Sequence, residues 1–141
     1  MKTHLTRRAV LLISIIGLFT GCERNDHADT AAPSGSTVSI VSVSPVIGTP
    51  LRTGERVKLA VGVSYHLSAD SGTLALVVQA ADNSAISQNF EVINRGSGQM
   101  ILEAEFQVPN TKAIQIFTPL SGQGQSATST VDSRAFKVVS N

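Results

Sequence analysis

The only cysteine of the chain, Cys22, stands where an apolar run ends and a polar stretch begins. A single thiol cannot form a disulfide within the chain. Three roles remain: a reactive nucleophile, a small buried side chain, or a site of modification. The residue type alone does not distinguish these roles, so the role of Cys22 is inferred from the sequence around it.

Three residue types of a hydrolase triad occur close together, at Ser64, His66 and Asp70. A serine and a histidine two positions apart on a strand share one face. They lack the strained turn and the oxyanion donors that acyl transfer requires. We therefore expect His66 to be an exposed strand histidine and not a catalytic base.

Other polar groups suggest chemistry only weakly. Glu103 and Glu105 would lie about 7 Å apart on one strand, a spacing compatible with paired-carboxylate catalysis but expected here of solvated surface charges. The glycine-rich stretch at 121–126, "SGQGQS", lacks the Lys-Ser/Thr ending and the helix of a phosphate loop, which indicates an interstrand loop or a partner contact. Oxygen ligands for calcium are present but form no Asp-x-Asp-x-Asp series: Asp70, Asp82, Asn83 and Asp132. We predict no enzyme, no metal and no cofactor.

Composition indicates one small globular unit. The chain has 141 residues, of which 42% are hydrophobic and 15% charged, enough for a continuous core. Three of its 11 basic residues precede Cys22: Lys2, Arg7 and Arg8. The remainder of the chain therefore contains eight basic and ten acidic residues. That remainder has no basic stripe with interleaved aromatics, which argues against nucleic-acid binding.

The first 21 residues have the pattern of an export signal. Residues 1–8 carry positive charge, and residues 9–19 are uncharged and mostly large and apolar. Eleven residues of helix rise about 16 Å, roughly half the thickness of a bilayer core. The segment is therefore predicted to be a cleaved signal and not a spanning anchor.

The end of this signal resembles the lipobox of bacterial lipoproteins, with Phe19, Thr20, Gly21 and Cys22 in its four places. The resemblance implies cleavage between Gly21 and Cys22, a diacylglycerol on the Cys22 thiol and acyl chains such as palmitate on the new amine. Phe19 departs from the pattern, which prefers leucine there. An ordinary secretory signal with an incidental cysteine is the alternative, and the pair Arg7-Arg8 leaves twin-arginine export open beside the general secretory route.

Glu23 follows the cysteine, and the sorting tendency of these lipoproteins then implies the outer membrane, because an aspartate there would retain the chain at the inner one. Residues 22–37 are predicted to form a flexible tether, since they lack apolar periodicity. Its one histidine, His27, has no second imidazole or thiol nearby for a metal site. The predicted domains are thus 1–21, the signal; 22–37, the lipidated tether; and 38–141, a folded domain.

From residue 38 onward the chain alternates strand and turn signals. In "VKLAVGVSYHL", 57–67, every second residue is apolar, and "MILEAEFQV", 100–108, repeats this pattern. In the first strand the apolar parity changes between Ile40 and Val41, as a bulge would require. The predicted strands are 37–43, 57–67, 73–80, 85–93, 100–108, 112–118 and 129–139.

Seven strands at this spacing resemble the immunoglobulin-like or fibronectin-type modules of bacterial proteins. The resemblance implies an all-β fold, an antiparallel sandwich without the Cys and Trp landmarks of antibody domains. The function expected is that of a non-enzymatic, membrane-anchored envelope protein that binds or scaffolds another envelope protein through the strand at 98–108 or the loop at 119–128. The alternative is a periplasmic inhibitor of an envelope hydrolase, acting through loops 94–98 and 121–126. Candidate contact residues are Arg95, Gln123 and Gln125.

Overall fold

The computed structural model describes residues 35–124, 128 and 130–140. Its strands are β1 (Thr37–Ser44), β2 (Leu51–Arg52), β3 (Arg56–Ala80), β4 (Ala85–Gln107), β5 (Ala113–Gly122) and β6 (Thr130–Val139). The predicted signal, the predicted lipidation site at Cys22, His27, most of the predicted tether and Gln125 lie outside the described residues. Within the described part, no helix is long and apolar enough to cross a bilayer.

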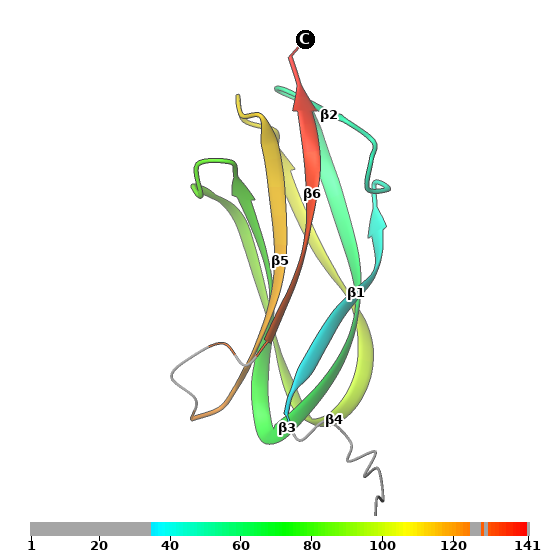
Figure 1. Ribbon diagram of the computed structural model, residues 1–141, viewed down its shortest axis with the longest axis vertical. Coiled ribbons are helices and arrows are strands. Elements are labelled where there is room, and N and C mark those ends of the chain that lie inside the picture. Colours follow the sequence, from blue (N-terminus) through cyan, green and yellow to red (C-terminus); the bar gives the residue numbers. More distant parts are fainter. Residues whose placement is uncertain (1–34, 125–127, 129, 141) are drawn as a thin grey trace, which may run out of the picture.

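Two layers of sheet share one long hairpin, formed by β3 and β4 (Figure 1). The first half of β3 pairs with β1 on one side and with the end of β4 on the other, which makes a three-stranded layer. The second half of β3 pairs with the start of β4 and with β5, and β5 pairs with β6, which makes a four-stranded layer. The hairpin passes between layers at its bend, so the strand pairing is continuous from β1 to β6.

Seven strands predicted from the sequence correspond to this arrangement, with different boundaries. The predicted breaks at 70–72 and 94–98 are irregularities and bends inside β3 and β4, because the register shifts between Leu67 and Ser71 and pairing then resumes. The predicted strands at 57–67 and 73–80 are therefore one element, as are those at 85–93 and 100–108. The two-residue β2 was not predicted, since it is too short to carry a pattern.

The predicted parity change in the first strand is confirmed as a bulge. The register of β1 against β3 shifts between Ile40 and Ser42. The chain then leaves this layer, and β2 pairs in parallel with the end of β6 in the other layer, Leu51 against Val138.

The inward faces of both layers meet in an apolar core, as the alternation at 57–67 predicts. Leu59, Val61 and Val63 are fully buried, and Lys58, directly before Leu59, is exposed. The opposite layer supplies the other half of the core. Its fully buried residues are Leu74, Leu76, Val78, Ile114, Ile116 and Leu120. Thr118 is a buried polar residue among them, and its hydroxyl donates to the Asp132 carbonyl.

Both open sides of the sandwich are closed by polar side chains that bind the backbone of the opposite layer. On one side, the Asp132 carboxylate of β6 accepts from the Ile40 amide at 2.8 Å, and Arg134 donates to Asp132 at 2.7 Å and to the Ile40 carbonyl at 3.4 Å. On the other side, the Asn89 amide donates to the Glu103 carbonyl at 3.1 Å, and its oxygen accepts from the Phe90 amide. These bonds satisfy backbone groups that no strand pairs.

The Asp132 carboxylate is kept ionised by its hydrogen bonds. Partial burial acts to raise the pKa of Asp132. The Ile40 and Ser133 amides and Arg134 outweigh this effect, so the pKa lies below its ordinary value. Because the folded pKa is the lower one, the stabilisation is present above the unfolded pKa near 4 and is lost as the pH falls through the folded value.

We expect Asp132→Asn to lower the free energy of unfolding at pH 7 by about 1–3 kcal/mol, because a charge-assisted bond to the bulge is weakened. Urea unfolding of both proteins at pH 7 and at pH 3 measures this. The deficit of the variant should be smaller at pH 3, because this pH lies below the ordinary pKa of an aspartate, where the stabilisation by the charged carboxylate begins to be lost. An equal loss of unfolding free energy at both pH values would contradict the claim that the ionised Asp132 carboxylate stabilises the fold.

Gly72, at the bend, leaves no room for a side chain: an added Cβ would lie 2.5 Å from the Ser121 carbonyl oxygen and 3.0 Å from Leu67. We expect Gly72→Ala to destabilise the domain by about 1–3 kcal/mol through this overpacking. Gly35→Ala is the matched control, since nothing lies within 4 Å of its added Cβ. Thermal or urea unfolding compares the two, and equal stabilities would show that the bend yields to the extra methyl group.

Candidate binding surface

The end of the molecule at the β3–β4 bend gathers two of the three residues predicted to contact a partner. Arg95 pairs with Asp70 at 2.7 Å, and both side chains are well exposed. The Gln123 amide donates to the Ser71 carbonyl at 2.8 Å, and the Ser71 hydroxyl donates to the Gln123 side chain. Since Asp70 and Ser71 are neighbours in the chain, Arg95 and Gln123 lie at the same end.

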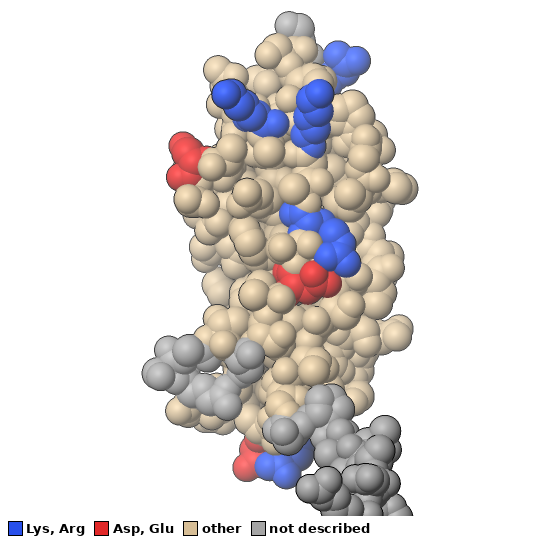
Figure 2. Space-filling model, in the orientation of Figure 1, with Lys and Arg blue, Asp and Glu red and all other residues tan. Residues whose placement is uncertain are grey.

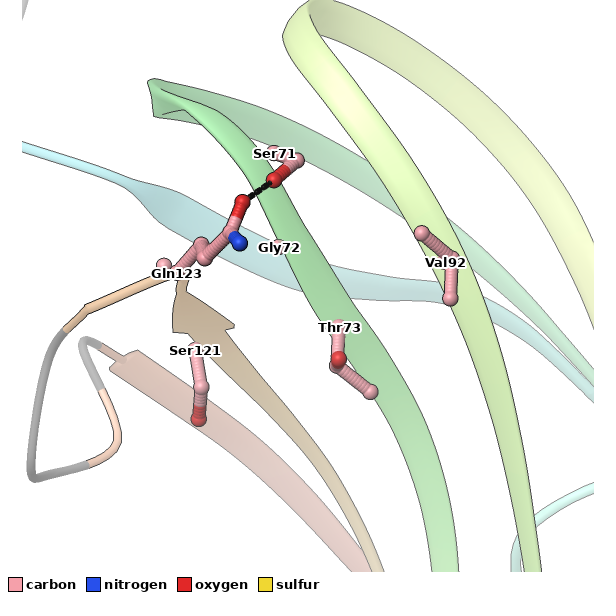
Figure 3. A pocket seen from close by; sticks show the side chains of 7 residues that line it. Ser71, Gly72, Thr73, Val92, Ser121 and Gln123 are labelled. Atoms are coloured by element: carbon pink, nitrogen blue, oxygen red, sulfur yellow. Dashed lines mark hydrogen bonds between the residues drawn. The ribbon is translucent and has the colours of Figure 1, made fainter.

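A shallow hollow of about 320 Å³ opens beside Gln123. Figure 3 shows the Ser71 hydroxyl bonded to Gln123 at its rim, with Thr73 and Ser121 on neighbouring strands and Val92 across from them. The lining is hydroxyl, amide and aliphatic, with no charged side chain. It offers hydrogen bonds to a neutral group but contains no base or nucleophile with an activating partner.

The other residues considered for chemistry are held in structural contacts. His66 shares a hydrogen bond of 2.9 Å with Ser97, while Asp70 pairs with Arg95, so the two are not joined in a relay to Ser64. Glu105 faces Arg56 at 3.6 Å on the surface. These contacts are typical of exposed strands.

The candidate calcium ligands are separated in the fold. Asp82 belongs to the β3–β4 turn, where the Ser84 hydroxyl and amide bind its carboxylate and lower its pKa. Asp70 lies at the bend and Asp132 on β6. Among the described residues, no three His, Cys, Asp or Glu side chains come together as a metal site.

The predicted inhibitory loop at 94–98 is not a loop. These residues belong to β4 and pair with β3, from Asn94 with Ser71 to Gly98 with Tyr65. A protruding segment for insertion into an enzyme cleft is therefore absent at this place. The segment at 121–126 does leave the sheet after Gly122, and its residues Ser121, Gly122 and Gln123 border the hollow.

The outer face of the four-stranded layer is the surface that the sequence reasoning missed. One row of apolar residues crosses all four strands: Ala75 of β3 lies between Phe90 of β4 and Pro119 of β5, and Pro119 pairs with Val131 of β6. Phe90 is 58% exposed, Val92 81% and Val131 52%. The next row holds Val77 and Phe117, partly buried.

Charge is nearly absent from this face. Among the described residues that point outward from these four strand segments, Lys137 is the charged one. Glu91 pairs with the inward-facing Leu74, so it is not on the outer face. In Figure 2, which shows one side of the molecule, the charged atoms gather toward the two ends and at one central spot, and large tan areas separate them. The three-stranded layer, in contrast, carries Lys58, Glu103 and Glu105 outward.

The sequence held a signal for this surface. In "TLALVVQA", 73–80, residues of both parities are apolar, and so are Phe90, Val92 and Phe117 on the neighbouring strands. Strands that are apolar on both faces are typical of sheets covered on both sides. No second layer covers this face within the described chain, so these apolar side chains form an exposed patch of the sandwich.

Comparison with solved structures identifies the fold. A protein of Bacteroides fragilis described as a β-galactosidase superposes with a TM-score of 0.52 at 9% identity, covering 74% of this chain and 16% of that one. The CARDB domain of a Pyrococcus furiosus protein, crystallised in complex with di-metal ions, superposes with a TM-score of 0.50 at 8% identity, covering 77% of this chain and 97% of that domain. The domain is an immunoglobulin-like β-sandwich.

At these identities the likeness extends to the fold of the sandwich alone. No protein-family model matches the chain, and no curated protein resembles it closely enough in sequence to count as a relative. The function of this sandwich therefore has to be argued from its own surface.

Alanine substitutions of two phenylalanines, one on the outer face and one in the core, test which of the two rings supports the fold. We expect Phe136→Ala, at a ring 1% exposed, to cost about 3–5 kcal/mol of unfolding free energy. Phe90→Ala, at a ring 58% exposed, should cost less than about 1 kcal/mol, since little burial is lost. Urea unfolding in dilute solution makes the comparison. A large loss for Phe90→Ala would mean that its ring supports the fold and is not part of a presented surface.

Proposed function

We propose that the protein is a non-enzymatic, lipid-anchored envelope protein that presents its sandwich to another envelope component. The observation that carries this proposal is the uncharged apolar row formed by Phe90, Ala75, Pro119 and Val131. An exposed patch of a few hundred Å² is about the largest that a monomeric soluble protein usually shows, and such patches are often interaction sites. The exposure of Phe90 and Val131 in this row supports a role in binding.

The lipid anchor is supported by the sequence around Cys22. Its position after an 11-residue apolar run and directly after Gly21 fits a modification site better than a reactive or a buried thiol. Several acyl chains, each contributing on the order of 0.8 kcal/mol per buried CH₂, would make attachment essentially permanent. Glu23 supports delivery to the outer membrane.

The geometry of the domain supports its attachment by the bend end. The Ser36 hydroxyl bonds to the Ser68 hydroxyl at 3.1 Å and accepts from the Ser68 amide at 3.2 Å, which fixes the first described residues beside the bend. The chain from Cys22 to Gly35 reaches at most about 45 Å when extended. The bend end then faces the bilayer, and the strands run away from it.

Metabolic labelling with palmitate tests the anchor in a bacterium with two membranes. We expect the full-length chain to be labelled and to sediment with the outer membrane, and Cys22→Ser to be unlabelled and soluble. Glu23→Asp is the matched variant: it should keep the label and move to the inner membrane. Membrane association of Cys22→Ser equal to that of the unchanged chain would overturn the lipid anchor.

A further inference from the structure

We propose that a second copy of this chain covers the apolar outer face of the four-stranded layer, in a face-to-face dimer whose two copies point the same way. This inference rests on the proposed function, because the membrane anchor fixes the direction in which both copies point. Its structural basis is the composition of the face, its pattern across the strands and the position of the first described residues.

The absence of charge makes the face compatible with itself. In a two-fold symmetric dimer each face meets a copy of itself. A charged residue on such a face is paired only if the same face carries an opposite charge at the position that it meets. Here Lys137, near one end, is the charged residue among the described outward positions. Two copies can therefore meet without burying an unpaired charge.

The apolar row is also complementary in shape under one symmetry. A two-fold axis parallel to the strands, between β3 and β5, lays β4 of each copy over β6 of the other. Phe90 then lies over Val131 of the second copy. Beside Val131 is a shallow hollow of about 320 Å³ lined by Val77, Phe117 and Pro119 among others, which can receive part of the Phe90 ring.

The position of the first described residues selects this axis. Ser36 is bonded to Ser68 at the bend, so the tether leaves each copy at that end. An axis parallel to the strands keeps both bends at the same end, within reach of one membrane. An in-plane axis across the strands would place the two bends at opposite ends, and one copy could not reach its anchor.

The size of the face fits a modest dimer. Four strands about 4.8 Å apart, over six residues of about 3.3 Å each, project roughly 400 Å². Because side-chain relief adds to the projected area, two copies would bury on the order of 1,000 Å² in total, near the lower limit for a specific interface. Anchoring in one bilayer adds a high effective concentration to this contact.

Cysteine crosslinking in membranes tests the dimer, using the full-length chain with Cys22 in place. Thr73 lies next to the proposed axis, opposite Ser121 of the second copy, and layers pack about 10 Å apart. We expect Thr73→Cys, treated with a short bismaleimide, to give at least a five-fold stronger band of twice the chain mass than Ser64→Cys. Ser64 is the matched control, on the outer face of the other layer. Mass spectrometry should show this chain alone in the band.

A charge introduced into the face should remove that band. Phe90→Lys in the Thr73→Cys background should abolish crosslinking, while Ile101→Lys, at a residue 70% exposed on the other layer, should not. Equal bands from Thr73→Cys and Ser64→Cys would overturn the dimer, and a band containing a different protein would replace the second copy with that partner. Palmitate labelling of the same samples reports the anchor separately, so loss of the anchor and loss of the dimer are distinguishable.

Discussion

The bend in the β3–β4 hairpin determines the arrangement of the rest of the domain. One pair of strands contributes to both layers, and the layers can face each other only because the hairpin turns between Leu67 and Ser71. Gly72 brings β3 against the backbone of β5 at this place, closer than any side chain would allow. The same turn places Ser68 beside Ser36 and Ser71 beside Gln123, so the start of the domain and the loop after β5 share one end.

Much of this fold could be predicted from local patterns. Apolar residues occupy every second position at 57–67 and 100–108, as expected of a half-buried strand. A bulge changes which positions face inward, and the change of apolar parity at Ile40 and Val41 therefore predicted one. The continuity of β3 through Asp70 could not be predicted, because polar and glycine residues mark a loop and a sharply bent strand alike. Only the pairing of Ser71 with Asn94 separates the two.

The apolar outer face depends on the fold more than the individual strands do. Arg95 and Gln123 were predicted as contacts because loops often bind; the structure places them at one end, with Arg95 in β4. The wider apolar face combines four strands that are far apart in the chain, and its rows depend on register: Ala75 meets Phe90 and not Glu91 because of where the hairpin turns. A sequence shows that a strand is apolar on both sides, but only the sheet shows which apolar positions become neighbours. The anchor predicted at Cys22, in contrast, depends on a contiguous sequence motif and not on the fold.

Asn89 has a consequence for how many copies can join. It lies on the free edge of β4, where exposed amides could recruit another strand and, through it, an unlimited series of strands. Its side-chain oxygen accepts a hydrogen bond from the Phe90 amide of that edge, and its side-chain nitrogen donates to the Glu103 carbonyl of the facing layer, so one backbone group in each layer is already satisfied. The addition of further strands along this edge, which is how fibrils grow, is therefore interrupted at Asn89.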